Sequence, residues 1–116
     1  MDSISEITTR INEFRDARDW KQFHNPKDMA ISVSIEAAEL MEQFQWKNDA
    51  ECEEHLQANR ESVADEMADV AIYLFELADL MKMDLGSAML RKLEKNAAKY
   101  PVQKAKGSNK KYNDLE

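Results

Sequence analysis

The chain has 116 residues, of which 34% are charged, a net charge of −7 and a single cysteine. This length predicts one domain, one cysteine excludes an internal disulfide and a cysteine-based zinc site, and the acidic balance argues against binding duplex nucleic acid. With two glycines, two prolines and no apolar run of membrane-spanning length or charged-then-apolar leader, we expect an all-α, cytoplasmic protein without a membrane partner.

Capping residues predict where the first two helices begin. Ser3 followed by Glu6 is a capping-box pattern, which predicts a helix over residues 4–22. Asn25 before Pro26 is typical of an N-cap and a first helical position, so a second helix is expected to run to Trp46.

The rest of the chain predicts two more helices and a tail. A third helix is expected over residues 51–82, with a break or kink near its start because its apolar seam is regular only from Val63 onward. Asp84 caps a fourth helix that ends at Lys99, before Pro101. Residues 1–102 therefore predict a four-helix, bundle-like protomer, and the lysine-rich residues 103–116 predict a flexible basic tail.

The predicted third helix carries more apolar residues than a single-chain bundle requires. Beside the Val63 seam, small and large apolar side chains occupy adjoining and opposite sides of the helix: Ala64, Ala68, Ala71, Ile72 and Phe75. A helix with one wet face does not need them. The pattern predicts a contact between copies of the chain.

Two acid pairs share one spacing and one helical phase. Glu36 and Glu39 lie three residues apart in the predicted second helix, and Glu66 and Asp69 repeat this spacing in the third. Residues at i and i+3 occupy one helix face, and both pairs border an apolar seam. If the seams pair, four carboxylates converge, and a hard divalent cation such as Mg²⁺ is the group that such a site favours. Acid pairs are also common on solvated helix faces, and that interpretation stays open.

Other candidate site residues are aromatic or basic. Aromatic rings near the ends of the second helix indicate either core packing or a pocket for a nucleobase: Trp20, Phe23, His24 and Trp46. His24 has no second histidine at ligand spacing, which favours a structural or base-contacting role over metal binding. A polar stripe on the fourth helix indicates either a solvated face or phosphate contacts, and comprises Lys92, Lys95, Asn96, Lys99 and Tyr100.

Together these motifs resemble the all-α nucleoside triphosphate pyrophosphohydrolases of the MazG-like superfamily, and within it the dCTP pyrophosphatase branch. The matching stretches are residues 18–20, 22–24, 36–40, 44–47, 66–70, 72–74, 99–101 and 110–112. The resemblance implies hydrolysis of a nucleoside triphosphate, dCTP or a related pyrimidine nucleotide, to a monophosphate and pyrophosphate by metal-activated water. It also implies a homo-oligomer, with a tetramer favoured over a dimer.

The resemblance assigns roles to the candidate residues. Mg²⁺, or Mn²⁺ in its place, is expected on Glu36, Glu39, Glu66 and Asp69. Separately from the resemblance, a carboxylate that the metal does not fully engage could take the proton from water, and Glu39 is the candidate for this general base. Substrate contacts are expected from the aromatic residues above, from Tyr73 and from the stripe on the fourth helix. The competing hypothesis is a non-catalytic helical dimerisation or interaction module, which the excess apolar surface and acidic exterior also fit.

Overall fold

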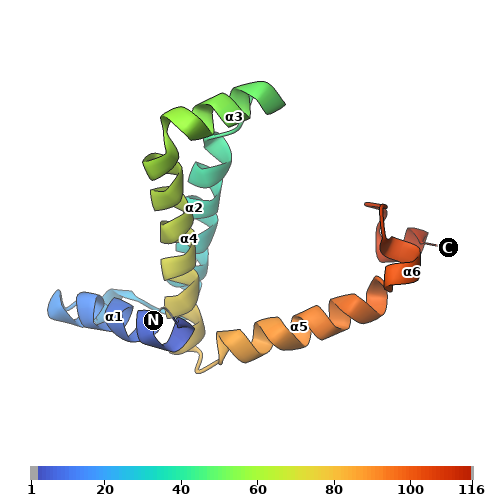
Figure 1. The fold of residues 1–116 in the computed structure, drawn as a ribbon. Helices are drawn as coiled ribbons and strands as arrows, with labels where there is room; N and C mark the ends of the chain where they lie inside the picture. The colour runs from blue at the N-terminus through green and yellow to red at the C-terminus, as the bar shows by residue number, and fades with distance from the viewer. Residues whose placement is uncertain (1–2, 116) are drawn as a thin grey trace. The chain divides into compact units, whose positions relative to one another are not determined.

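The computed structural model describes residues 3–115, which form helices and turns (Figure 1). In chain order the elements are α1 (Ile4–Ala17), the 3₁₀ turn η1 (Lys21–Phe23), α2 (Pro26–Glu42), α3 (Asp49–Ala58), α4 (Arg60–Leu80), α5 (Leu85–Lys99), α6 (Val102–Ala105) and the 3₁₀ turn η2 (Tyr112–Asp114). Because residues 3–115 contain no strand, the predicted all-α class is confirmed. None of the helices in this range combines the length and the hydropathy needed to cross a bilayer.

The chain divides into two compact units. The first extends through Met83 and contains α1 to α4, and the second begins at Asp84 and contains α5, α6 and η2. Within the second unit, the Tyr112 ring meets the Tyr100 ring edge-on, with their centroids 6.2 Å apart. The predicted domain boundary after Val102 and the flexibility of the residues beyond it stay predictions.

The first unit is organised by the pairing of α2 with α4. The two helices run antiparallel and side by side, α3 connects their ends, and α1 packs across the end of α4 near Leu80 (Figure 1). Met29 of α2 and Val63 and Ala78 of α4 are the buried apolar residues. This core is small because α1, α2 and α4 cover only part of one another, and the four-helix bundle-like protomer stays a prediction, since α5 belongs to the second unit.

Three predicted helices differ from those observed. The first ends at Ala17 rather than at residue 22, because Asp19 takes a left-handed conformation with φ of 56° and the Trp20 N–H turns back to the Arg15 carbonyl at 3.1 Å. The third is two helices, α3 and α4, and the expected break lies at Asn59, which ends one and caps the other. The second ends at Glu42 rather than at the predicted Trp46, which takes a left-handed conformation with φ of 66°.

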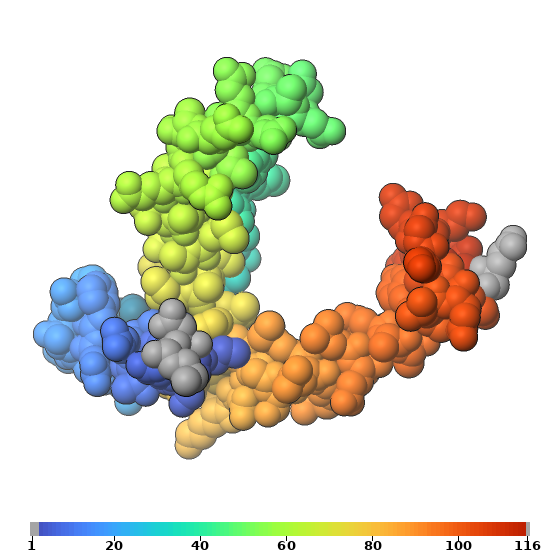
Figure 2. Space-filling view, in the orientation of Figure 1, coloured from blue at the N-terminus to red at the C-terminus, as the bar shows by residue number. Residues whose placement is uncertain are grey.

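Large apolar side chains remain exposed over much of the first unit. Met67, Leu74 and Met81, which continue the Val63 seam at helical spacing, are exposed in the single chain. Figure 2 shows much of the yellow-green α4 surface uncovered between α3 and α1. The seam is therefore wider than the area that α2 and α1 cover.

The N-cap of α2 gives a testable contribution to stability. The Asn25 side chain accepts a hydrogen bond from the Asp28 N–H at 2.9 Å and donates one to the Asp28 carboxylate at 2.7 Å. We expect Asn25→Ala to lower the free energy of unfolding by about 1 kcal/mol, the usual cost of losing such a cap. Chemical denaturation at fixed protein concentration measures it, with the exposed Lys27→Ala as control. Equal stability of the two variants would contradict this assignment.

Candidate active site

Three carboxylates meet where α2 and α4 pair. Glu36 and Glu39 come from consecutive turns of one face of α2, and Glu66 comes from the facing side of α4. One oxygen from each side chain lies within 4.8 Å of the corresponding oxygens of the other two. The antiparallel pairing thus brings both acid-bearing turns together, and their charges face one another rather than separate patches of solvent.

The electrostatics of this acid cluster indicate that a positive charge belongs there. Partial burial raises the pKa of Glu36 and of Glu66, and a hydrogen bond shared with Glu39 and repulsion from Glu39 and Asp69 raise both further. One oxygen of each, Oε2, is buried without a hydrogen-bond partner among the described residues. Buried carboxylate oxygens that lack donors suit a hard divalent cation, so the residues present fit Mg²⁺ or Mn²⁺.

Asp69 lies one helical turn beyond Glu66 on α4 and lines the neighbouring cavity. The sequence treated it as an equal member of the acid quartet, whereas only the other three place oxygens within 4.8 Å of one another. Its charge still acts on the cluster, since it raises the pKa of Glu36 and Glu66. Asp69 therefore connects the acid cluster to the cavity.

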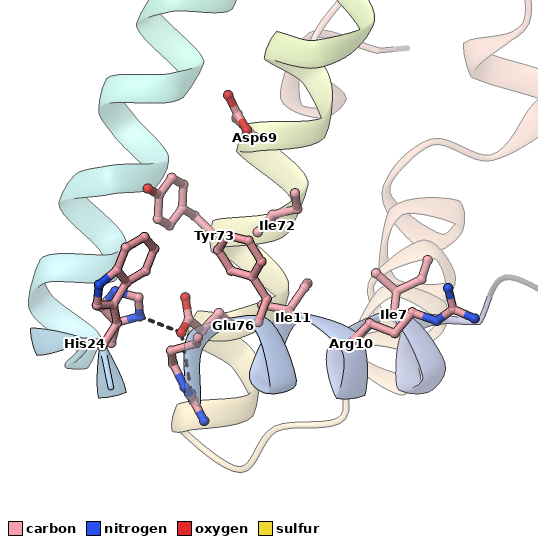
Figure 3. Close-up of a pocket in the computed structure, with 11 residues that line it drawn as sticks. Ile7, Arg10, Ile11, His24, Asp69, Ile72, Tyr73 and Glu76 are labelled. Carbon is pink, nitrogen blue, oxygen red and sulfur yellow. Dashed lines mark hydrogen bonds and ion pairs between the residues drawn. The ribbon is translucent and has the colours of Figure 1, made fainter. Parts of the chain in front are cut away.

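The cavity lies between α1 and α4 and has a volume of about 430 Å³ (Figure 3). Its wall is largely apolar and aromatic, formed by Ile7, Ile11, Phe14, Trp20 and Ile72. The rings of Phe14 and Trp20 meet edge-on with centroids 5.8 Å apart. Such a wall accepts a flat, apolar-faced group, and its acidic rim lies beside the acid cluster.

Tyr73 lies on the same wall of the cavity, one turn of α4 from Asp69 (Figure 3). Burial is the main cause that raises the pKa of its phenol, and repulsion from the carboxylates of Glu36 and Asp69 adds to it. The hydroxyl is therefore held in its protonated form, as a hydrogen-bond donor.

A buried group of charged side chains closes one side of the cavity. Glu76 is 2% exposed, and its Oε1 accepts from Arg15 Nη1 at 3.4 Å and lies 2.6 Å from His24 Nδ1. Hydrogen bonding to Asp16 is the main cause that raises the pKa of Arg15. Sequence reasoning missed Arg15 and Glu76 as site residues. The available signal was Glu76 itself, an acid between Phe75 and Leu77 in an apolar part of α4.

The aromatic residues predicted for one pocket separate into two groups. Trp20 and His24 line the cavity, whereas Phe23 is an exposed residue of η1 and is not part of the lining. Trp46 is 92% exposed and follows the far end of α2, a helix of 17 residues that is roughly 25 Å long. Within one chain, Trp46 therefore does not contribute to this cavity.

The predicted phosphate-binding residues lie in the second unit. Lys95, Asn96 and Lys99 are on α5 and Tyr100 is its C-cap, so their part in the site stays a prediction. On the first unit, an open hollow on the α3 side of the acid cluster contains Lys47 and His55, which sequence reasoning missed. His55 Nε2 lies 2.6 Å from the side-chain oxygen of Gln43.

Comparison with known proteins gives the family of the chain. The model of the MazG-like family matches residues 31–115. The dCTP pyrophosphatases 1 of Bos taurus and Homo sapiens are 42% and 41% identical over 115 residues, which cover 97% of this chain and 68% of each relative. A crystal structure of a pyrophosphatase from Archaeoglobus fulgidus superposes with a TM-score of 0.81 at 43% identity, covering 87% of this chain and 94% of that one.

The chain therefore belongs to the MazG-like family, as its motifs predicted. The similarity to the dCTP pyrophosphatases and to the archaeal structure confirms the class of enzyme, a nucleoside triphosphate pyrophosphohydrolase.

The raised pKa values predict how the metal-free protein responds to pH. A carboxylic acid whose pKa is raised by folding stabilises the folded state below its ordinary value of about 4.5, and this contribution is lost as pH rises through the raised value. We therefore expect Glu66→Gln to raise the melting temperature at pH 8 in EDTA and to lessen the fall of stability as pH rises above the ordinary value of about 4.5. Thermal unfolding measures both effects.

The control is Glu61→Gln, the same change on an exposed part of the same helix, which should leave the pH dependence as in the wild type. Mg²⁺ should raise the melting temperature of the wild type and of this control but not that of Glu66→Gln. A wild-type protein whose stability does not respond to Mg²⁺ would count against the fit of the acid cluster to a cation.

Proposed function

We propose that the chain hydrolyses a pyrimidine deoxynucleoside triphosphate, dCTP or a related or modified nucleotide, to its monophosphate and pyrophosphate. The observation that carries the proposal is the adjacency of an acid cluster without counter-charge to an aromatic cavity, with Asp69 between them. A triphosphate requires a cation beside it and its base requires a flat apolar wall. The relatives named dCTP pyrophosphatase support the choice of base.

The acid cluster would hold Mg²⁺ through Glu36, Glu39 and Glu66, with Asp69 beside it. A divalent cation there supplies charge neutralisation of phosphate oxygens and lowers the pKa of bound water. Glu39 is the exposed member of the cluster, so it is the carboxylate best placed to take a proton from water that enters from solvent. Glu36 and Glu66, each with one buried oxygen, would serve mainly as ligands.

The cavity would hold the base and the second unit would contact the phosphates. Trp20 and Phe14 offer aromatic faces for stacking, and Tyr73 offers a hydroxyl donor on the side nearest the acids. Four residues of the stripe on α5 and at its C-cap carry donors and positive charge suited to phosphate oxygens: Lys95, Asn96, Lys99 and Tyr100.

The functional form is proposed to be a homo-oligomer, with a tetramer favoured over a dimer. The exposed apolar surface supports this, since α2, α4 and α5 each leave large side chains exposed in one chain: Ile35, Met41, Met67, Leu90 and Leu93. In such an assembly, Trp46, which lies far from its own cavity, is available to the cavity of a neighbouring chain.

The reaction is tested by incubating the protein with Mg²⁺ and a panel of deoxynucleoside triphosphates that includes modified cytosines. We expect pyrophosphate and a monophosphate, and we expect Glu36→Gln to lower kcat at least about a hundredfold, as loss of a pre-organised charge does. Glu53→Gln, an exposed acid of α3, is the control and should keep wild-type activity. Orthophosphate as the only phosphate product would contradict the proposed reaction, and no turnover of any nucleotide would favour a non-catalytic helical module.

The assembly is tested by light scattering on a sizing column. We expect a mass of about four times the 13.4 kDa of one chain. Leu93→Glu places a charge on the apolar face of α5 and should lower the measured mass, because burial of that charge is costly. Gln57→Glu adds the same charge to the exposed face of α3 and should leave the mass unchanged. A monodisperse wild-type monomer would contradict the proposed assembly.

A further inference from the structure

The group formed by the buried Arg15 and Glu76 and the half-buried His24 has no part in the chemistry described above. Burying a carboxylate is costly unless it is paired, and Glu76, at 2% exposed, is paired twice through one oxygen, by Arg15 and by His24 (Figure 3). Arg15 is shared, because its Nε also binds the Asp16 carboxylate at 2.9 Å, and its contact with Glu76 is longer, at 3.4 Å. The contact with His24, at 2.6 Å, is therefore the closer of the two that Glu76 makes.

The contact determines which nitrogen of His24 carries the proton. A carboxylate oxygen only accepts, so a neutral imidazole with Nδ1 at 2.6 Å from Glu76 Oε1 must carry its proton on Nδ1. The second nitrogen, Nε2, is then an acceptor. Among residues 3–115, Nε2 has no hydrogen-bond partner, and His24 is part of the cavity lining.

An acceptor in this place distinguishes bases by their exocyclic groups. Cytosine carries an amino group at position 4, which donates, whereas uracil and thymine carry an oxygen there, which only accepts. An amino group at position 4 would donate a hydrogen bond to Nε2. An oxygen there would place two hydrogen-bond acceptors against each other, and no hydrogen bond would form. A site that leaves a buried polar group unpaired rejects the ligand that causes it.

We propose that Glu76, supported by Arg15, fixes His24 in the Nδ1-protonated form, so that Nε2 reads the 4-amino group of a cytosine-type base and rejects 4-oxo pyrimidines. This inference rests on the proposed function and adds a specificity-determining residue, His24, and a positioning residue, Glu76. The other polar residues of the cavity lining are Arg10, Asp69 and Tyr73. Within residues 3–115, none of them forms a hydrogen bond or an ion pair with His24, whose side chain is joined to Glu76.

The test compares two substrates that differ in the pyrimidine ring, dCTP and dUTP, by pyrophosphate release at pH 8. The wild type should prefer dCTP in kcat/KM by about tenfold or more, the effect of one unpaired polar group. His24→Phe keeps a ring in place and leaves the Arg15–Glu76 pair intact, and it should abolish the preference, mainly by raising the KM for dCTP. Glu76→Gln can donate or accept at Nδ1, so it should weaken the preference.

The matched control is Asp79→Asn, the same type of change one turn further along α4. Asp79 accepts a hydrogen bond from Asn12 of α1 at 2.9 Å and is not part of the cavity lining, so the dCTP preference should survive its replacement. Long-range proton–nitrogen NMR of the imidazoles shows which ring nitrogen carries the proton. A purely structural role of Glu76 would leave this proton position unchanged. The chain has two histidines, and the signals missing in His24→Phe belong to His24.

The result expected is an Nδ1-protonated His24 in the wild type and a changed proton distribution in Glu76→Gln. If Glu76→Gln does not fold, the inference is tested by the proton position in the wild-type spectrum and by the dCTP preference of His24→Phe. Equal use of dCTP and dUTP by the wild type, a preference that His24→Phe retains, or a proton on Nε2 would overturn the inference while leaving pyrophosphate release intact. Absence of pyrophosphate from every nucleotide would instead overturn the proposed function, and the inference with it.

Discussion

The antiparallel pairing of α2 with α4 is the constraint on which the site depends. This pairing brings Glu36 and Glu39 to face Glu66, and their mutual repulsion and partial burial are unfavourable in the absence of a counter-charge. The same pairing leaves the C-terminal half of α4 free to meet α1, where the cavity forms. One helix, α4, thus supplies an acid to the cluster, an acid to the cavity rim and a buried acid behind the cavity.

The cost of the acid cluster explains the arrangement around it. Folding the metal-free chain stores electrostatic repulsion between α2 and α4, which a divalent cation would relieve, so metal binding and stability are coupled. Glu76, by contrast, is a buried carboxylate of the cavity lining that already has partners in the protein, Arg15 and His24. The acid cluster therefore lacks a counter-charge among the described residues, whereas the Glu76 carboxylate is paired.

The sequence predicted what depends on local chemistry. Ser3, Asn25 and Asp84 cap helices as expected, and the i, i+3 spacing of the acids places them on one face. It did not predict the end of α1, because Asp19 adopts a left-handed conformation that glycine more commonly takes. It also missed the contact of Arg15 with Glu76, which are 61 residues apart and meet only because α1 packs on α4. The aromatic residues near α2 were grouped by sequence proximity, but the length of that helix separates Trp46 from Trp20 and His24.

The central claim is that Glu36, Glu39 and Glu66 form a divalent cation site, and the most direct measurement is anomalous diffraction from crystals grown with Mn²⁺. The account predicts a strong anomalous peak bounded by oxygens of these three side chains, with Asp69 beside it. An anomalous peak elsewhere with this cluster empty, or carboxylates turned apart toward solvent with no ion between them, would contradict it.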